Sequence, residues 1–332
     1  MSLTFAGIAL EDILAARKTS VAGALNLLES RRPEEERPAA ALIEALTHHS
    51  RASRHVIGVT APPGAGKSTL ISRLIHEYRS AGFRVGVITV DPSSSRSGGA
   101  LLGDRARIDC DPADPGLFIR SMAAGRHLGG LAWRTRHCLV LFEAAYDRIL
   151  IETTGVGQSE TEIENVADTV VYVVQPGSGD SLQFMKAGIL EIPHVLVVNK
   201  ADHQNLALKA YHELQALPGV SGRSESEKGW KPALILASAL EGWGHKDLVE
   251  ALEDHRRRLS TDELEKRRRE HRIRWVYLLF LERYGSQGVE RLGGEGKILE
   301  RLKVADLANP FRALQDLAGN AGSQSSEVIR PA

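Results

Sequence analysis

The sequence predicts an α/β fold in which helices cover both faces of a mainly parallel β-sheet, with helical extensions at both ends of the chain. From residue 53 onward, apolar runs rich in valine and isoleucine alternate with amphipathic helical patterns, as in parallel strands joined by helices. The 332 residues suffice for one core of about 200 residues with appendages. We therefore divide the chain into residues 1–52, 53–253 and 254–318, and expect a disordered tail over residues 319–332.

Seven apolar runs are candidate strands. Residues 85–90 and 195–198 are almost continuously apolar, as strands buried on both faces require. In such sheets, ligands lie beyond the carboxyl ends of the strands, so polar residues just after the runs are candidate site residues. The runs are residues 55–60, 84–90, 116–121, 147–152, 168–174, 193–198 and 232–237.

The first run is followed by APPGAGKST at residues 61–69, which matches the phosphate-binding pattern G-x-x-x-x-G-K-[ST] except for Ala61 at its first position. Backbone N–H groups at the head of a helix surround phosphate oxygens where glycine permits close approach, here at Gly64 and Gly66. In this pattern Lys67 reaches the β- and γ-phosphates and Ser68 holds Mg²⁺. The predicted phosphate-binding residues are Pro63, Gly64, Ala65, Gly66, Lys67, Ser68 and Thr69.

Carboxylates at two other strand ends are candidate Mg²⁺ ligands together with Ser68. Asp91 follows the run 84–90, Glu152 ends the run 147–152, and Asp104 closes the serine- and glycine-rich segment after Asp91. Mg²⁺ takes oxygen ligands and keeps several waters, so one or two carboxylates suffice. A solvated loop that caps its own backbone is the alternative interpretation of the segment between Asp91 and Asp104.

The segment after Glu152 is typical of a sensor for a terminal phosphate. Gly155 lies three residues further on, where its N–H can meet the γ-phosphate while the carboxylate acts on Mg²⁺ directly or through water. Gln158 is a candidate for orienting the attacking water, although it is displaced from the usual position for that role. The catalytic candidates are therefore Lys67, Asp91, Glu152 and Gln158.

Two further strand ends carry a signal for guanine. Asn199-Lys200-Ala201-Asp202 follows the run 193–198, and Ser238-Ala239-Leu240 follows the run 232–237. The Asp202 carboxylate can accept from the ring N–H and the exocyclic amine of guanine, whereas adenine has no matching pair of donors. Lys200 would pack over the base, Asn199 would tie the loops together, and the Ala239 N–H would meet the guanine carbonyl. These residues favour GTP over ATP.

Composition narrows the class of partner. The 42 basic residues balance 42 acidic ones, so no overall positive field favours nucleic acid or an anionic membrane. The two cysteines have no metal-binding spacing and form no disulfide framework. No signal peptide is recognised near Met1 and no apolar run approaches the length of a membrane span, so we expect a cytoplasmic protein.

The two ends of the chain are expected to be helical. In residues 1–52 apolar residues recur at helical spacing, with breaks expected at Pro33 and Pro38. This extension either packs on the core or contacts another chain. Residues 273–284 carry a broad apolar stripe that must be buried, formed by Ile273, Val276, Tyr277, Phe280, Leu281 and Tyr284. The basic residues before it are expected to form a solvated face rather than a nucleic-acid site: Lys266, Arg267, Arg268, Arg269, Arg272 and Arg274.

These motifs resemble those of the MeaB/ArgK-type GTPases, the G-protein chaperones of adenosylcobalamin-dependent acyl-CoA mutases. The similarity runs from about residue 27 to residue 240 and includes ESRRP at 29–33, the loop 91–104, ETTGVGQSE at 152–160 and QPGSGDSLQ at 175–183. The resemblance implies a homodimer that hydrolyses GTP with Mg²⁺ and gates cobalamin loading or removal. Cobalamin would be bound only through the partner, a methylmalonyl-, isobutyryl-, ethylmalonyl- or 2-hydroxyisobutyryl-CoA mutase. The GTP and GDP states are expected to differ at residues 92–105, 153–162 and 176–183, the last being the family's third switch.

Three other functions remain open on the sequence alone. A nickel-insertion GTPase of related architecture would need grouped cysteine or histidine ligands, and the chain has no C-x-x-C motif and no histidine-rich tract. A P-loop kinase would need a pocket for a phosphoryl acceptor with a general base. A non-catalytic scaffold would keep its partner regulation after loss of Lys67.

Overall fold

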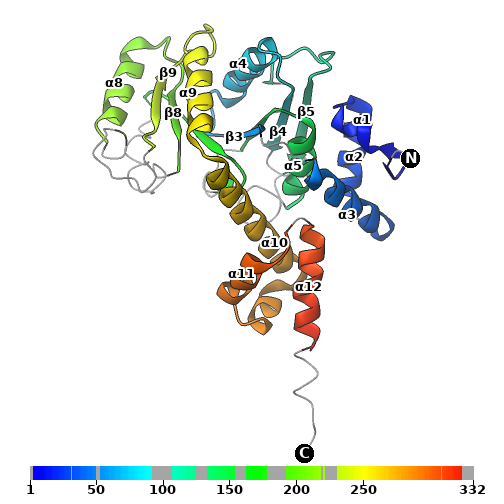
Figure 1. Cartoon of the computed structure of the whole chain (residues 1–332). Helices are drawn as coiled ribbons and strands as arrows, with labels where there is room; N and C mark the ends of the chain where they lie inside the picture. Colours follow the sequence, from blue (N-terminus) through cyan, green and yellow to red (C-terminus); the bar gives the residue numbers. More distant parts are fainter. Residues whose placement is uncertain are drawn as a thin grey trace, which may run out of the picture.

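A seven-stranded parallel sheet forms the centre of the computed structural model (Figure 1). The structure describes residues 3–30, 32–49, 53–91, 107–123, 133–153, 162–177, 192–217, 220, 230–307 and 309–323. The strand order is β5-β4-β6-β3-β7-β8-β9, so the first strand of the sheet in the chain lies at its middle. The bounds are β3 (His55–Thr60), β4 (Val85–Asp91), β5 (Leu117–Ala123), β6 (Arg148–Glu152), β7 (Thr169–Val174), β8 (Val195–Val198) and β9 (Ala233–Leu236). All seven predicted strands are confirmed.

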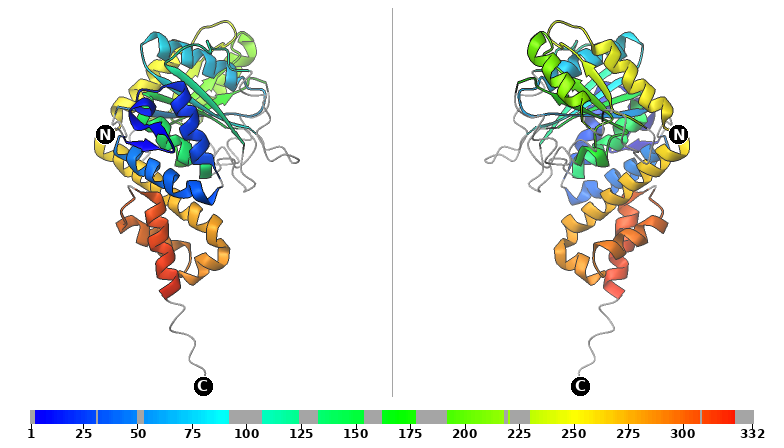
Figure 2. Two further views of the ribbon diagram at one scale, coloured as in Figure 1. Left: turned by 90° about the vertical axis from the view of Figure 1, so that its right-hand side faces the viewer. Right: turned by 90° about the vertical axis from the view of Figure 1, so that its left-hand side faces the viewer.

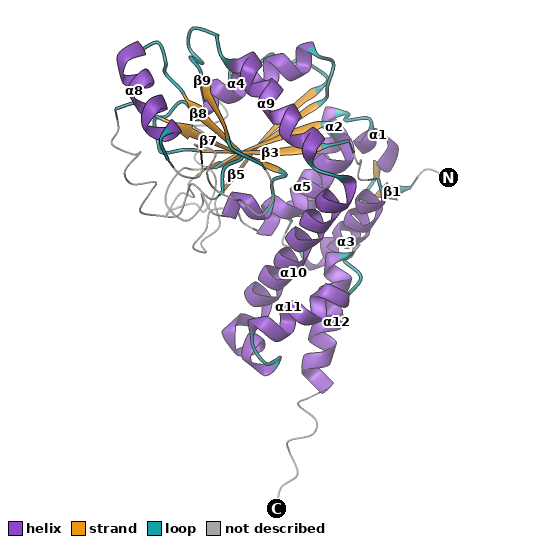
Figure 3. Ribbon diagram, turned by 60° about the vertical axis from the view of Figure 1, so that its left-hand side comes forward, coloured by secondary structure: helices purple, strands orange, loops and turns teal. Residues whose placement is uncertain are grey.

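Helices cover both faces of this sheet, as the alternation of patterns predicts (Figure 3). Because side chains alternate along a strand, Val56 faces one layer and Ile57 the other. One layer consists of α4 (Lys67–Ser80) and α9 (His245–Arg258), and the opposite layer contains α5 (Trp133–Ala145). Helix α8 (Gln204–Gln215) packs beside β8 and β9. The fold is thus the predicted α/β architecture.

The N-terminal extension packs on α5. It contains a short hairpin of β1 (Thr4–Phe5) and β2 (Ile8–Ala9), which the sequence did not indicate, and helices α1 (Leu10–Leu14), α2 (Lys18–Glu29) and α3 (Pro33–His48). Arg120 on edge strand β5 donates two hydrogen bonds of 2.8 Å to the Glu29 carboxylate and so ties α2 to the sheet. The break expected at Pro38 is wrong, because α3 continues through that residue. The break expected at Pro33 is present, because α2 ends at Glu29 and α3 begins at Pro33.

Three C-terminal helices project from the sheet layers, as the two side views show (Figure 2). They are α10 (Thr261–Arg291), α11 (Glu295–Val304) and α12 (Pro310–Ser323). Helix α9 continues past residue 253, where the domain boundary is predicted, and α12 continues past residue 318. Most of the predicted apolar stripe on α10 is buried, but Tyr284 is 41% exposed. Gly285 interrupts α10 with a φ of 65°, a kink that the sequence pattern did not predict.

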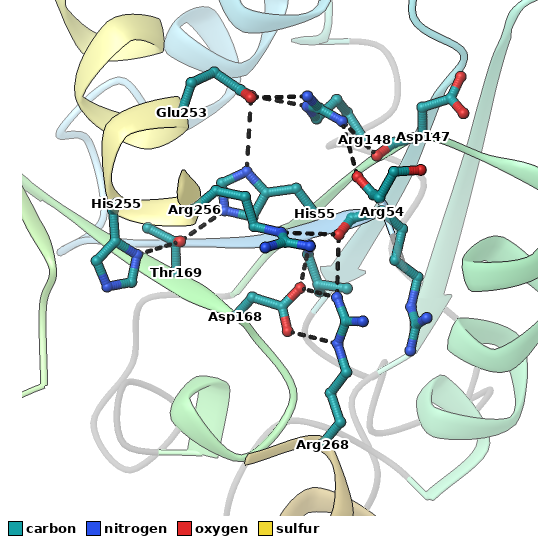
Figure 4. A network of polar contacts seen from close by, with 12 residues as sticks. Arg54, His55, Asp147, Arg148, Asp168, Thr169, Glu253, His255, Arg256 and Arg268 are labelled. Atoms are coloured by element: carbon teal, nitrogen blue, oxygen red, sulfur yellow. Dashed lines mark hydrogen bonds and ion pairs between the residues drawn. The ribbon is translucent and has the colours of Figure 1, made fainter. Parts of the chain in front are cut away.

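A buried polar network joins α9 and α10 to the amino ends of the central strands (Figure 4). Arg268 donates hydrogen bonds of 3.0 and 2.8 Å to the two oxygens of Asp168, which lies just before β7. Burial alone would raise the pKa of Asp168, but the Arg268 guanidinium holds it at about 2. The expectation that Arg268 belongs to a solvated face is therefore wrong, since only 3% of this residue is exposed. The Asp168 carboxylate holds Arg268 inside the fold. The spacing of residues in the sequence does not reveal this contact.

Candidate functional site

The predicted site residues that the structure describes lie at the carboxyl edge of the sheet. The loop of residues 61–66 leaves β3, Glu152 ends β6, Asn199 follows β8 and Ser238 follows β9. Asp91 ends β4, next to β6, with backbone pairing to Ala123 of β5. This is the edge at which parallel α/β sheets bind ligands, because the loops from neighbouring strands meet there.

The loop after β3 has the backbone shape of a phosphate cradle. Gly64 and Gly66 take left-handed conformations with φ of 81° and 89°, and α4 begins at Lys67 directly after them. A Cβ atom at Gly66 would lie 2.5 Å from Asn199 Nδ2, so this glycine is also required by packing. Ala61 is fully buried in the core with its methyl group, which explains why alanine is accepted at the first position of the pattern.

Lys67 and Ser68 lie at the head of α4, where the helix N–H groups and dipole favour an anion. The Lys67 ammonium donates to the carbonyl oxygen of Ala61 at 3.0 Å, which holds it beside the cradle. The Ser68 hydroxyl donates to Glu152 Oε1 at 2.9 Å. Two hard oxygen groups from α4 and β6 therefore meet beside the phosphate loop, and this donor set fits Mg²⁺.

A pocket of about 310 Å³ opens beside the phosphate loop. Ser68 and Glu152 are not among its lining residues, which are Gly66, Thr69, Asn199, Lys200, Asp202, His203, Ala239 and Leu240. The predicted guanine-binding loops after β8 and β9 thus form one pocket. Lys200 has a φ of 56°, a conformation uncommon for residues with a side chain, at the turn between Asn199 and Asp202.

Hydrogen bonds fix the two loops of this pocket. The Ser238 hydroxyl donates to Asp202 Oδ1 at 2.8 Å and lowers the pKa of this carboxyl group, which stays ionised. Asn199 Nδ2 donates to the Ala65 carbonyl oxygen at 2.9 Å, and Asn199 Oδ1 accepts from the Ala239 N–H at 3.2 Å. Asn199 ties the loops together as predicted. The Ala239 N–H, predicted to meet the guanine carbonyl, is engaged by Asn199 here.

Several residues that support the site were not predicted. Arg73 on α4 donates to the carbonyl oxygens of Ala239 and Leu240, at 2.9 and 3.1 Å, and so positions the last loop. His203 lines the base pocket 3.6 Å from Asp202 Oδ2. Thr153 donates to the Thr60 hydroxyl at 2.9 Å and joins the ends of β6 and β3. The Arg73 and Thr153 contacts join different elements, His203 contacts its neighbour in the same loop, and no local pattern marks any of them.

Some predicted site residues lie outside the described part of the chain. These are Asp104, Gly155 and Gln158, together with most of the three predicted switch segments. The backbone of Asp91 is described, and its side chain is not. Among the described residues, no group of three or more histidine, cysteine, aspartate or glutamate side chains forms a metal cluster. In the same part of the chain, no helix combines the length and the apolar character that a membrane crossing requires.

Comparison with known proteins also indicates a GTPase. A family model described as methylmalonyl-CoA mutase-associated GTPase MeaB matches residues 21–290. A protein described as a putative GTPase from Pyrococcus horikoshii is 41% identical over 252 residues, which cover 76% of this chain and 78% of that protein. The GTPase ArgK of Escherichia coli is 35% identical, with 78% of each chain covered.

A mouse protein and a solved structure extend the comparison. The protein described as mitochondrial methylmalonic aciduria type A homolog, from Mus musculus, is 30% identical over 81% of this chain and 68% of its own length. A crystal structure described as a LAO/AO transport system kinase superposes with a TM-score of 0.67 at 25% identity, covering 94% of this chain and 96% of that one.

Proposed function

The chain belongs to the methylmalonyl-CoA mutase-associated GTPases, and we propose that it uses GTP hydrolysis to gate the loading or removal of adenosylcobalamin in an acyl-CoA mutase. The partner would be a methylmalonyl-CoA mutase or one of its close relatives. Cobalamin would be bound by that mutase and not by this chain. One observation supports GTP binding and hydrolysis: the phosphate loop, the Ser68–Glu152 pair and the Asp202 pocket lie together at one edge of the sheet.

The residues of the site have distinct roles in hydrolysis. Asp202 would select guanine, and the N–H groups at the head of α4 would surround the phosphates. Lys67 would offset the charge that develops on the β- and γ-phosphoryl oxygens, the main requirement of phosphoryl transfer. Ser68 and Glu152 would hold Mg²⁺, with Asp91 and Asp104 as further candidates. When bound, this ion neutralises phosphate charge.

Other roles fall to residues outside the described part of the chain. Gly155 would contact the γ-phosphate and Gln158 would orient the attacking water. Loss of the γ-phosphate would then release the segment after Glu152 and change the surface offered to the mutase. We place the contact between two copies of the chain on the C-terminal helices, because they project from the sheet layers (Figure 2).

The experiment that tests this function combines the purified chain with each candidate mutase loaded with cobalamin. We expect the cobalamin absorbance spectrum to report cofactor transfer that depends on GTP, with phosphate released and no phosphorylated product. Lys67→Ala should abolish both effects while leaving the far-ultraviolet circular dichroism unchanged. Phosphate release from GTP with no effect on cobalamin in any of these mutases would contradict the chaperone function and leave the GTPase intact.

A further inference from the structure

A second cavity, of about 460 Å³, lies between α5, the 3₁₀ turn η2 (Ile163–Asn165) and the C-terminal helices. Three carboxylates line it, those of Glu143, Glu265 and Asp306. Five arginines line it as well: Arg54, Arg136, Arg268, Arg269 and Arg272. Three of these arginines are paired with carboxylates, Arg54 with Glu143, Arg268 with Asp168 and Arg272 with Glu265. Arg136 and Arg269 outnumber Asp306 by one charge, so the cavity favours an anion.

This cavity is separate from the nucleotide site. Arg54 directly precedes β3, and Asp168, which holds Arg268, directly precedes β7 (Figure 4). Both residues lie at the amino ends of the central strands. The phosphate loop and the base pocket lie at the carboxyl ends of the same strands. No residue lines both cavities.

Three buried N–H donors in the lining lack a hydrogen-bond partner among the described residues. They are Arg136 Nε, Arg268 Nη1 and Trp275 Nε1. These residues are 5%, 3% and 4% exposed, so bulk water does not satisfy the donors. A buried donor without a partner is costly, and buried polar groups are rarely left in this state. A ligand with several acceptor oxygens would satisfy these donors once the three side chains turn toward the cavity.

Arg136 is the most informative of these residues. Its Nη1 donates to the backbone oxygens of Asn165 and His271, at 3.3 and 3.2 Å. Within the described part of the chain, no carboxylate lies within ion-pair distance of this guanidinium. Burial lowers the pKa of Arg136 to about 10, so it remains charged at neutral pH. A buried charge without an ion partner is costly, and an anion in the cavity would supply that partner.

Part of the remaining lining is apolar, beside the polar residues Thr47, His48, Asn165 and His271. Leu139, Val140, Val166 and Leu307 contribute to it, together with the ring of Trp275. The volume also exceeds that of an inorganic anion and lies in the range typical of small-molecule sites. The cavity therefore fits a ligand with an anionic group at the arginines and an organic part against these side chains.

We propose that this cavity binds a phosphate monoester of a small organic molecule, with the phosphoryl oxygens accepting from Arg136, Arg268 and Trp275. A phosphoryl group offers three terminal oxygens for the three donors, and its negative charge pairs with the Arg136 guanidinium. Guanidinium groups also suit phosphate oxygens geometrically. A monocarboxylate offers only one charge and two oxygens.

Isothermal titration calorimetry with inorganic phosphate as the probe tests the proposal. The full chain is kept saturated with a non-hydrolysable GTP analogue and Mg²⁺ at low ionic strength, so that the γ-phosphate position is filled and the nucleotide site does not take up the probe. We expect one phosphate site per chain and at least tenfold weaker binding of acetate. Trp275→Phe keeps the aromatic ring and removes one donor, so it should weaken phosphate binding about tenfold.

Variants of arginines on the same cavity and outside it complete the test. Arg136→Gln should abolish phosphate binding, and Arg291→Gln, at the exposed end of α10, should leave it unchanged. GDP affinity reports the integrity of each variant. If Arg136→Gln does not fold, Trp275→Phe decides the question. Absence of phosphate binding, equal binding of acetate, or unchanged phosphate binding in Trp275→Phe would overturn the proposal.

Discussion

Asn199 links the phosphate loop to the base pocket through one carboxamide. Its nitrogen donates to the loop at Ala65 and its oxygen accepts from Ala239 in the last loop of the sheet. Because only 2% of this residue is exposed, both bonds are shielded from water. The Asp202 carboxylate is positioned differently: one oxygen accepts from the Ser238 hydroxyl at 2.8 Å, and the other lies toward His203 in the pocket.

The substitution Asp202→Asn tests the guanine assignment. An amide cannot accept from both the ring N–H and the amine of guanine, so GTP affinity should fall by about 10²-fold or more. Affinity for xanthosine triphosphate should rise, because its carbonyl group accepts from the new amide. Fluorescence titration with labelled nucleotides measures both. Asp316→Asn on α12 is the matched control and should bind GTP normally, while unchanged GTP affinity in Asp202→Asn would refute the assignment.

The residues proposed to contact the nucleotide were predictable from the sequence, and residues that act by tertiary contact were not. Lys67 and Asp202 stand in short patterns whose spacing fixes their place relative to a strand end. Arg73 is an ordinary basic residue on a helix, and its contact with the Ala239 loop depends on a segment 166 positions further along the chain. His203 follows Asp202 directly, but nothing in its spacing marks it as part of the pocket.

The central strand β3 was predictable as an element because its apolar run is bounded by polar residues. The packing of η2 against this strand was not predictable from the sequence. Gly58 pairs with strands on both sides and directly faces η2, where a Cβ atom would lie 2.4 Å from Ile163 Cγ1 and 3.1 Å from Ala167 Cβ. Ile163 is fully buried, so it has little space to move away. The missing side chain at Gly58 is therefore what lets η2 lie close to the sheet.

The substitution Gly58→Ala should lower the free energy of unfolding by about 1–3 kcal/mol, because the added methyl overpacks the contact with Ile163. Urea unfolding followed by circular dichroism measures this change. Gly296→Ala is a suitable control, because this glycine lies in α11 with no atom within 4 Å of an added Cβ. The control should raise stability by about 0.4–1 kcal/mol. Equal stability of Gly58→Ala and the wild type would show that η2 shifts to accommodate the added methyl group.

Two helices show where local rules gave the wrong element boundaries. Pro38 lacks the N–H that would donate to Glu34, but α3 tolerates it because apolar residues further along bury the helix on α5. Gly285 leaves α10 with a left-handed φ within a long helical pattern. Packing on α5 accounts for the first case, whereas Gly285 is exposed and its kink has no packing explanation in the structure.

The whole molecule depends on a buried junction between the sheet and the C-terminal helices. Sequence periodicity predicts that α10 is buried, but it does not say against what. In the structure, Arg268 reaches Asp168 at the amino end of β7 and also donates to the Arg54 backbone oxygen at 3.1 Å. Asp168 accepts from the Val56 N–H at 3.0 Å as well. One carboxylate thus joins two central strands to α10.

The substitution Arg268→Met should lower the free energy of unfolding by about 3–5 kcal/mol at neutral pH, because it leaves the Asp168 carboxylate buried without its cation. Arg257→Met removes an exposed pair with Asp254 and should change stability by less than about 1 kcal/mol. Chemical unfolding of both variants in parallel measures the difference. A loss no greater than that of the control would show that the junction is not held by this ion pair.

Acidification should act in opposite directions on the wild type and on Arg268→Met. In the wild type the pKa of Asp168 is about 2 in the folded state, below its unfolded value near 3.8, so its contribution is complete above pH 4 and is lost as pH falls toward 2. Without Arg268, burial raises the folded pKa of Asp168 above the unfolded value, and the folded state then binds the extra proton. The stability gap between the two proteins should therefore shrink as pH falls from 7 toward 4. Unfolding curves at several pH values measure the gap. A gap that stays constant from pH 7 to pH 4 would mean that the folded-state pKa of Asp168 does not rise when Arg268 is removed.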